Sequence, residues 1–226
     1  MSWITESAKG GSNLRKHYTM QDIEIFIKDD LPDGIDPDFV FKYVASLLPQ
    51  HLLTEVDIVY VGQFDHLIQR GVNAIYEDGA IYISNLQDSD MDFVDDLIHE
   101  IAHSVEKKYP DQIYGNGRIE REFKAKRKKL YDILKEKGKN PPIEMIHNIS
   151  YSPELDNYLY KEVGYPVLNQ ICTFARLFIG AYSATSVREY FATSFEQYFM
   201  GDKMLVRNFS PAAHKALVNL EHMEVL

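Results

Sequence analysis

Two histidines four residues apart, with a glutamate directly after the first, mark the stretch that most constrains this chain. His99, Glu100 and His103 lie within residues 92–108, where apolar residues recur at helical spacing: Val94, Leu97, Ile98, Ile101 and Val105. On an α-helix, residues four apart share one face. Acidic residues open the segment and two lysines close it, as the helix dipole favours. The spacing predicts a helix with both imidazoles on one face, away from its apolar stripe.

This arrangement of side chains is suited to binding a metal ion. Two neutral imidazoles one helical turn apart can bind one zinc ion, and the intervening carboxylate can accept a proton from a water molecule that the zinc activates. We therefore expect His99 and His103 to be zinc ligands and Glu100 to be a general base. The alternative is an ordinary amphipathic helix with two surface histidines, because three fixed residues also occur by chance.

Composition narrows the class of protein and its partners. The 226 residues fit one domain, and the net charge of -10 gives no overall attraction to nucleic acid or acidic membranes. Cys172 is the single cysteine, which matches a reducing compartment. We find no signal peptide and no apolar run long enough to span a bilayer. We expect a protein that is cytoplasmic, or exported without a classical signal peptide, with neither nucleic acid nor membrane as partner.

Short apolar segments in the first hundred residues predict an α+β fold with a small mixed sheet. The pattern indicates strands at 22–28 and 57–61, a helix at 38–48, and a hairpin over 74–84 that turns at Asp78-Gly79. Residues 1–18 are polar, and we interpret them as a flexible arm. Residues 19–226 then form a single domain with a helical C-terminal half.

Residues 110–165 differ in amino-acid composition from the rest of the chain. Residues 113–139 are highly charged and predict a long polar helix, and residues 143–165 are rich in tyrosine and turns. We interpret 110–165 as a helical insertion that helps to form the wall of a cleft. Its basic residues fit a solvated helix face, or a patch for an acidic substrate or a phosphate backbone. No aromatic residue interleaves with the basic run at 124–129, which does not favour nucleic acid.

A catalytic zinc site needs a third protein ligand and an open position for water. His147 and His214 lack any supporting pattern. Residues 186–200 predict an amphipathic helix with aromatic residues on one face. Its other face carries four residues: Glu189, Ala192, Thr193 and Glu196. Because two of these residues are small, this helix can approach the histidine helix closely, so we expect Glu189 to be the third ligand, with Glu196 as the alternative.

Two segments, His99–His103 and Arg188–Phe195, resemble the gluzincin metallopeptidases of the anthrax lethal factor catalytic-domain type. The resemblance covers about 55–109 and 165–220, and it implies a zincin-like metallopeptidase fold that hydrolyses peptide or protein substrates with one Zn2+. In that family the aromatic-rich helix supplies the third ligand, and a tyrosine seven residues before it helps to stabilise the oxyanion. Tyr182 has that position here.

The chain departs from the family pattern in two places. The separation of His103 and Glu189 is 86 residues (189 − 103), longer than the pattern suggests, and we assign the excess to the insertion at 110–165. Thr193 stands where the family often has an acidic residue that supports a zinc histidine.

The hairpin strand 80–84 comes shortly before the histidine helix. In zinc peptidases of this kind such a strand forms the sheet edge, with which an extended substrate pairs. We therefore expect Ile81, Tyr82 and Ile83 to bind substrate, the alternative being an edge strand without that role. Two other functions remain open, a zinc hydrolase acting on a non-peptide substrate and a non-catalytic binding or structural protein. An intact Glu100 and Tyr182 argue against the second, because a structural zinc site needs no base.

Overall fold

The computed structural model describes residues 16–223. Residues 1–15 of the expected arm lie outside this range, and residues 16–18 belong to the first strand instead of to the arm. Within the described range, no helix is both long and apolar enough to cross a membrane.

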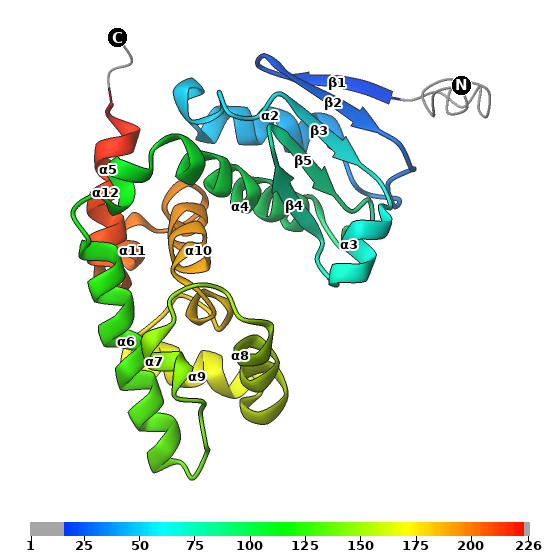
Figure 1. The fold of residues 1–226 in the computed structure, drawn as a ribbon. Helices are drawn as coiled ribbons and strands as arrows, with labels where there is room; N and C mark the ends of the chain where they lie inside the picture. The colour runs from blue at the N-terminus through cyan, green and yellow to red at the C-terminus, as the bar shows by residue number, and fades with distance from the viewer. Residues whose placement is uncertain (1–15, 224–226) are drawn as a thin grey trace, which may run out of the picture.

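One mixed sheet of five strands forms the N-terminal part of the fold (Figure 1). The sequence predicted a small mixed sheet but not its first strand. The strands are β1 (Lys16–Met20), β2 (Ile23–Ile27), β3 (Ile58–Val61), β4 (Ala74–Glu77) and β5 (Ala80–Ile83). Their order is β1-β2-β3-β5-β4. The three central strands run parallel to one another, and β1 and β4 pair antiparallel at the two edges.

Alternation of apolar residues gives the sheet one buried face. Seven residues of the central strands are at most 5% exposed: Ile23, Ile25, Ile27, Val59, Val61, Ile81 and Ile83. Side chains alternate between the two faces of a strand, so these residues lie together. They belong to the same apolar core as the buried residues of α2 (Pro37–Leu47) and α4 (Asp90–Lys108).

The predicted hairpin is confirmed, but its edge strand is not the expected one. Asp78 and Gly79 form its turn with φ of 45° and 91°, the backbone that a two-residue hairpin needs. β5 pairs with β3 as well as with β4, so the expectation that 80–84 is the edge strand is wrong. Ile81 and Ile83 are fully buried, and Tyr82 lies on the opposite face of the sheet, where it stacks on Tyr60 at 5.3 Å.

The other regular elements of residues 16–223 are helices and helical turns. The helices and helical turns are η1 (Gln50–Leu52), α3 (Asp65–Arg70), α5 (Pro110–Tyr114), α6 (Arg118–Glu136), α7 (Glu144–His147), α8 (Pro153–Asn157), η2 (Tyr158–Val163), α9 (Tyr165–Ala175), η3 (Tyr182–Ala184), α10 (Val187–Met200), α11 (Lys203–Phe209) and α12 (Pro211–Glu221). Figure 1 shows the sheet and the α7–α9 group at opposite ends of an arc, with α4 and α10 between them.

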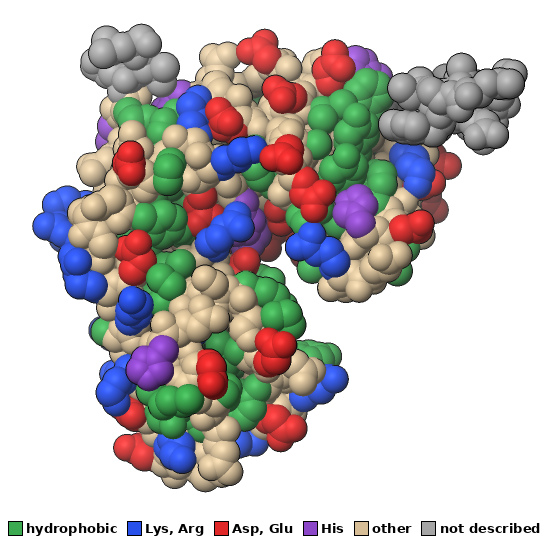
Figure 2. Space-filling model, in the orientation of Figure 1, with side chains coloured by type: hydrophobic (Ala, Val, Ile, Leu, Met, Phe, Trp, Pro, Cys, Tyr) green, Lys and Arg blue, Asp and Glu red, His purple; other side chains and the backbone are tan. Residues whose placement is uncertain are grey.

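A cleft opens between these two ends of the molecule. Figure 2 shows the surface hollowed there, and the cavity measures about 850 Å³. Its lining includes β4, the polar face of α4, η3 and the polar face of α10. The insertion supplies part of the wall through Tyr151, Asp156 and Tyr165, and the Tyr151 hydroxyl donates a hydrogen bond to Asp156 at 3.0 Å.

Candidate metal centre

Helix α4 presents the two histidines to the cleft because its other side is held in the core. Ser89 caps its N-terminus and accepts a hydrogen bond from the N–H of Asp92 at 3.2 Å. The five residues of the predicted apolar stripe, Val94, Leu97, Ile98, Ile101 and Val105, are at most 1% exposed. Burial of this stripe fixes the rotation of the helix, so that His99, Glu100 and His103 line the cavity.

Helix α10 brings Glu189 to the same place from a distant part of the chain. Ser186 caps the helix and accepts a hydrogen bond from the N–H of Glu189 itself at 3.1 Å. Ala192 is fully buried, and α10 packs directly against α4. The cap and the small residue therefore place the Glu189 carboxylate against the histidine face of α4.

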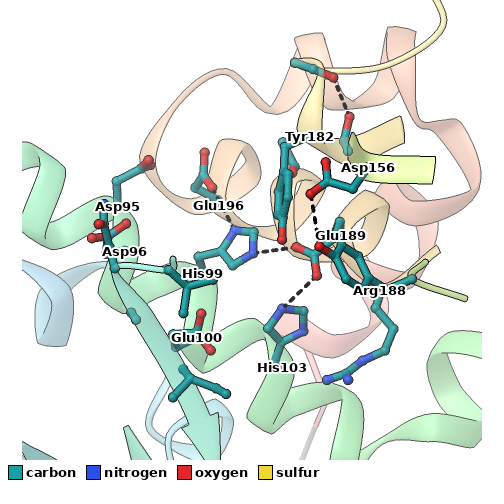
Figure 3. Close-up of a pocket in the computed structure, with 18 of the residues that line it drawn as sticks. Asp95, Asp96, His99, Glu100, His103, Asp156, Tyr182, Arg188, Glu189 and Glu196 are labelled. Atoms are coloured by element: carbon teal, nitrogen blue, oxygen red, sulfur yellow. Dashed lines mark hydrogen bonds and ion pairs between the residues drawn. The ribbon is translucent and has the colours of Figure 1, made fainter. Parts of the chain in front are cut away.

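The Nε2 atoms of both histidines face one carboxylate (Figure 3). His99 Nε2 lies 2.9 Å from Oε2 of Glu189, and His103 Nε2 lies 3.7 Å from its Oε1. His99, Glu100 and His103 each have one potential ligand atom, and these three atoms lie within 4.8 Å of one another. Two imidazole nitrogens and a carboxylate oxygen that converge on one point match the ligands of a catalytic zinc site.

The other nitrogen of each imidazole is held by a second carboxylate. His99 Nδ1 lies 3.3 Å from Glu196, and His103 Nδ1 lies 2.7 Å from Glu106. A carboxylate in this position fixes the tautomer and orientation of the ring and leaves Nε2 available to a metal. Glu196, the alternative third ligand, therefore contacts the back of His99, whereas Glu189 faces Nε2 of both rings.

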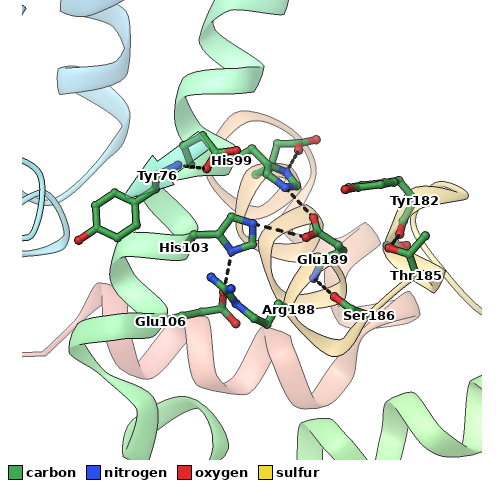
Figure 4. A network of polar contacts seen from close by, with 12 residues as sticks. Tyr76, His99, His103, Glu106, Tyr182, Thr185, Ser186, Arg188 and Glu189 are labelled. Atoms are coloured by element: carbon green, nitrogen blue, oxygen red, sulfur yellow. Dashed lines mark hydrogen bonds and ion pairs between the residues drawn. The ribbon is translucent and has the colours of Figure 1, made fainter. Parts of the chain in front are cut away.

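Glu106 is a site residue that the sequence analysis missed. Its side chain is only 5% exposed and accepts a hydrogen bond from the Tyr114 hydroxyl. It also accepts one from Arg188 Nε at 3.3 Å, and Figure 4 shows Arg188 beside it. Its position three residues after His103, on the same helix face, was the signal that could have revealed it. Glu106 contacts His103 and Glu196 contacts His99, so each histidine has a carboxylate partner although residue 193 is a threonine.

The charges of this network favour a cation. Burial lowers the pKa of His103, but the bonds from Glu106 and Glu189 outweigh this and raise the pKa to about 9. The pKa of His99 is raised well above its usual value, since Glu189 and Glu196 outweigh its burial. Burial raises the pKa of Glu189, yet the two histidines hold it well below the usual range. Glu189 thus stays charged and attracts a proton or a metal ion to the rings.

Acidic residues dominate the cleft beyond the histidines. Burial and the neighbouring Glu196 raise the pKa of Asp95 to about 7, and burial raises that of Asp96 to about 6. The two arginines in the lining are already paired, Arg70 with Glu77 at 3.2 Å and Arg188 with Glu106. The cleft is therefore a poor site for an anion.

Glu100 is buried beside the two rings and held in place. Its Oε2 accepts a hydrogen bond from the backbone N–H of Tyr76 in β4 at 2.6 Å. This bond leaves Oε1 as the freer oxygen of the carboxylate.

Tyr182 reaches the site from η3, and Figure 3 shows its ring beside Glu189. Burial raises the pKa of its hydroxyl and the charge of Glu189 adds to this effect, so the hydroxyl stays protonated and can donate. The turn that carries it is fixed by the buried Arg127 of α6, whose guanidinium donates to the carbonyls of Ala184, at 2.8 Å, and Thr185. His147 and His214 do not line the cavity.

Weakening the support of His103 should weaken zinc binding. In Glu106→Gln the buried partner of Nδ1 loses its charge, so we expect the Kd for zinc to rise about 10–100-fold, as is typical of such partners. A competition titration against a chromophoric chelator measures this. Glu136→Gln, on the exposed side of α6, is the control. An unchanged Kd would show that Glu106 does not support the ring.

Comparison of this chain with known proteins found no similar protein. No protein-family model, curated protein or solved structure matches this chain.

Proposed function

We propose that this protein is a zinc-dependent endopeptidase with a zincin-like fold. The observation that carries the proposal is the convergence of His99 Nε2, His103 Nε2 and Glu189, with both Nδ1 atoms occupied by other carboxylates. The resemblance of the same two helices to gluzincin peptidases supports it. His99, His103 and Glu189 would hold the ion, which when bound activates a water molecule as a Lewis acid.

The remaining residues of the cleft have roles in peptide hydrolysis. Glu100 accepts the proton of the attacking water and returns it to the departing amine. The Tyr182 hydroxyl donates a hydrogen bond to the carbonyl oxygen as negative charge develops there.

The edge strand β4 offers a binding surface for the substrate. Residues 72–77 line the cavity, and among the strands of the described residues β4 has a neighbour on only one side. An extended peptide can pair with such an edge and lie across the cleft. The substrate strand is thus expected on β4, the hairpin partner of the 80–84 segment.

Metal analysis and proteolysis together test this function. We expect one zinc per chain and cleavage of β-casein, an unfolded protein. Treatment with 1,10-phenanthroline should abolish cleavage, and added zinc should restore it. A protein that binds zinc and leaves a broad peptide library intact would instead be a hydrolase of another substrate or a non-catalytic protein.

Removing one hydroxyl should slow catalysis without affecting the metal. For Tyr182→Phe we expect kcat to fall about 100- to 1000-fold, the usual loss for one oxyanion donor. Zinc content should stay at the wild-type level, because the hydroxyl is not a ligand in this account. Steady-state kinetics on β-casein, with metal analysis of the same sample, measure both. A wild-type kcat would remove Tyr182 from the mechanism.

A further inference from the structure

The backbone groups of β4 point in two directions. Ile75 and Glu77 are paired with Tyr82 and Ala80 of β5. The carbonyl of Asn73 accepts a hydrogen bond from Ser84 at 2.7 Å, which places the odd-numbered residues of this strand in the bonded pairs. In an antiparallel ladder, bonded and non-bonded pairs alternate. The N–H and C=O groups of the even-numbered residues, at 74 and 76, therefore point away from β5.

One of these outward groups is already engaged. The N–H of Tyr76 donates to Oε2 of Glu100 at 2.6 Å, which the dashed line at Tyr76 marks in Figure 4. The side chain of Tyr76 is tied down separately, since its hydroxyl donates to the carbonyl of Glu55 at 3.0 Å. The edge strand and Glu100 are thus joined by a hydrogen bond from a backbone N–H, which no substitution of Tyr76 other than proline removes.

We propose that the Tyr76 N–H positions the Glu100 carboxylate, and that an extended peptide therefore pairs with β4 through the N–H and C=O of Ala74. The inference rests on the proposed function. A peptide N–H donates to the Ala74 carbonyl, and a peptide carbonyl accepts from the Ala74 N–H. Because Ala74 is two residues from the group that holds Glu100, the register of the peptide against the base is fixed. One peptide residue must then carry a free N–H, so proline is excluded there.

A proline substitution at Ala74 tests whether this residue pairs with the peptide. Ala74→Pro removes an N–H that the sheet does not use, and proline is tolerated at such edge positions. We expect kcat/KM for β-casein to fall at least tenfold, mainly through KM, with zinc content unchanged. Lys203→Pro is the matched control. It places proline at the first position of α11, after an extended Asp202, and should cleave as wild type does.

Two further measurements do not depend on the folding of the proline variant. In the first, single backbone nitrogens of a cleaved casein peptide are methylated in turn and the wild-type protein is tested on each peptide. Methylation of the residue that pairs with Ala74 should lower the cleavage rate at least tenfold, and methylation of its neighbours should not. By hydrogen exchange, the Tyr76 amide should exchange at least tenfold faster in Glu100→Ala, while the amides of Ile75 and Glu77 keep their rates.

The outcomes separate this inference from the function on which it rests. A wild-type protein that neither binds zinc nor cleaves any peptide would overturn both. Cleavage by the wild type, combined with a fully active Ala74→Pro variant or uniform tolerance of N-methylation, would overturn only the pairing at Ala74. An unchanged exchange rate of the Tyr76 amide would overturn the positioning of Glu100.

Discussion

Glu100→Gln should abolish peptide cleavage while zinc remains bound. A positioned general base contributes about 10²–10⁴-fold to the rate, and glutamine cannot accept the proton of the attacking water. Its amide oxygen can still accept the hydrogen bond from Tyr76, so the side chain should keep its place beside His99 and His103. The expected result is a loss of kcat of about 1000-fold on β-casein, with zinc content equal to that of the wild type.

The control for this variant is Glu24→Gln, which changes the same charge at an exposed position of β2. It should cleave β-casein at the wild-type rate. Undiminished cleavage by Glu100→Gln would exclude Glu100 as the base, and loss of its zinc would mean that the variant tests metal binding instead.

Glu189→Ala should remove zinc from the protein. It leaves two imidazoles without the carboxylate that faces both Nε2 atoms. Structural zinc in zinc-finger peptides binds with about 10–16 kcal/mol shared among four ligands, so one ligand accounts for roughly 3 kcal/mol, or more than 100-fold in Kd. Competition titration and metal analysis of the purified variant measure this loss.

Glu196→Ala is the matched comparison, because Glu196 lies on the same helix and contacts the back of His99. Its Kd for zinc should rise only about 10–100-fold. If instead Glu189→Ala kept its zinc and Glu196→Ala lost it, Glu196 would be the ligand and the orientation of the His99 ring would be reversed.

Local periodicity was sufficient to predict the elements that carry the candidate site. The apolar stripe of α4 set the direction of His99 and His103, and the helix predicted over residues 186–200 is α10, which Ser186 caps. Both signals lie within a few turns of helix. The α+β class and the Asp78-Gly79 turn followed from equally local patterns of apolar and turn residues.

Features that depend on distant pairing could not be read in this way. A hairpin pattern does not reveal which of its two strands pairs with β3, so the edge was assigned to 80–84 instead of β4. Residues 16–18 look polar in isolation and form β1 only because β2 pairs with them. The supporting role of Glu196 likewise arises only where α4 and α10 meet. That of Glu106 lies within α4, three residues after His103, and was missed although the spacing is local.

Anomalous diffraction at the zinc edge, from crystals of the wild-type protein, tests the central claim most directly. We expect one peak between α4 and α10, about 2.0–2.1 Å from Nε2 of His99 and of His103 and about 2.0–2.2 Å from a carboxylate oxygen of Glu189. Absence of a peak there after zinc is supplied, or a peak coordinated by other residues, would contradict it.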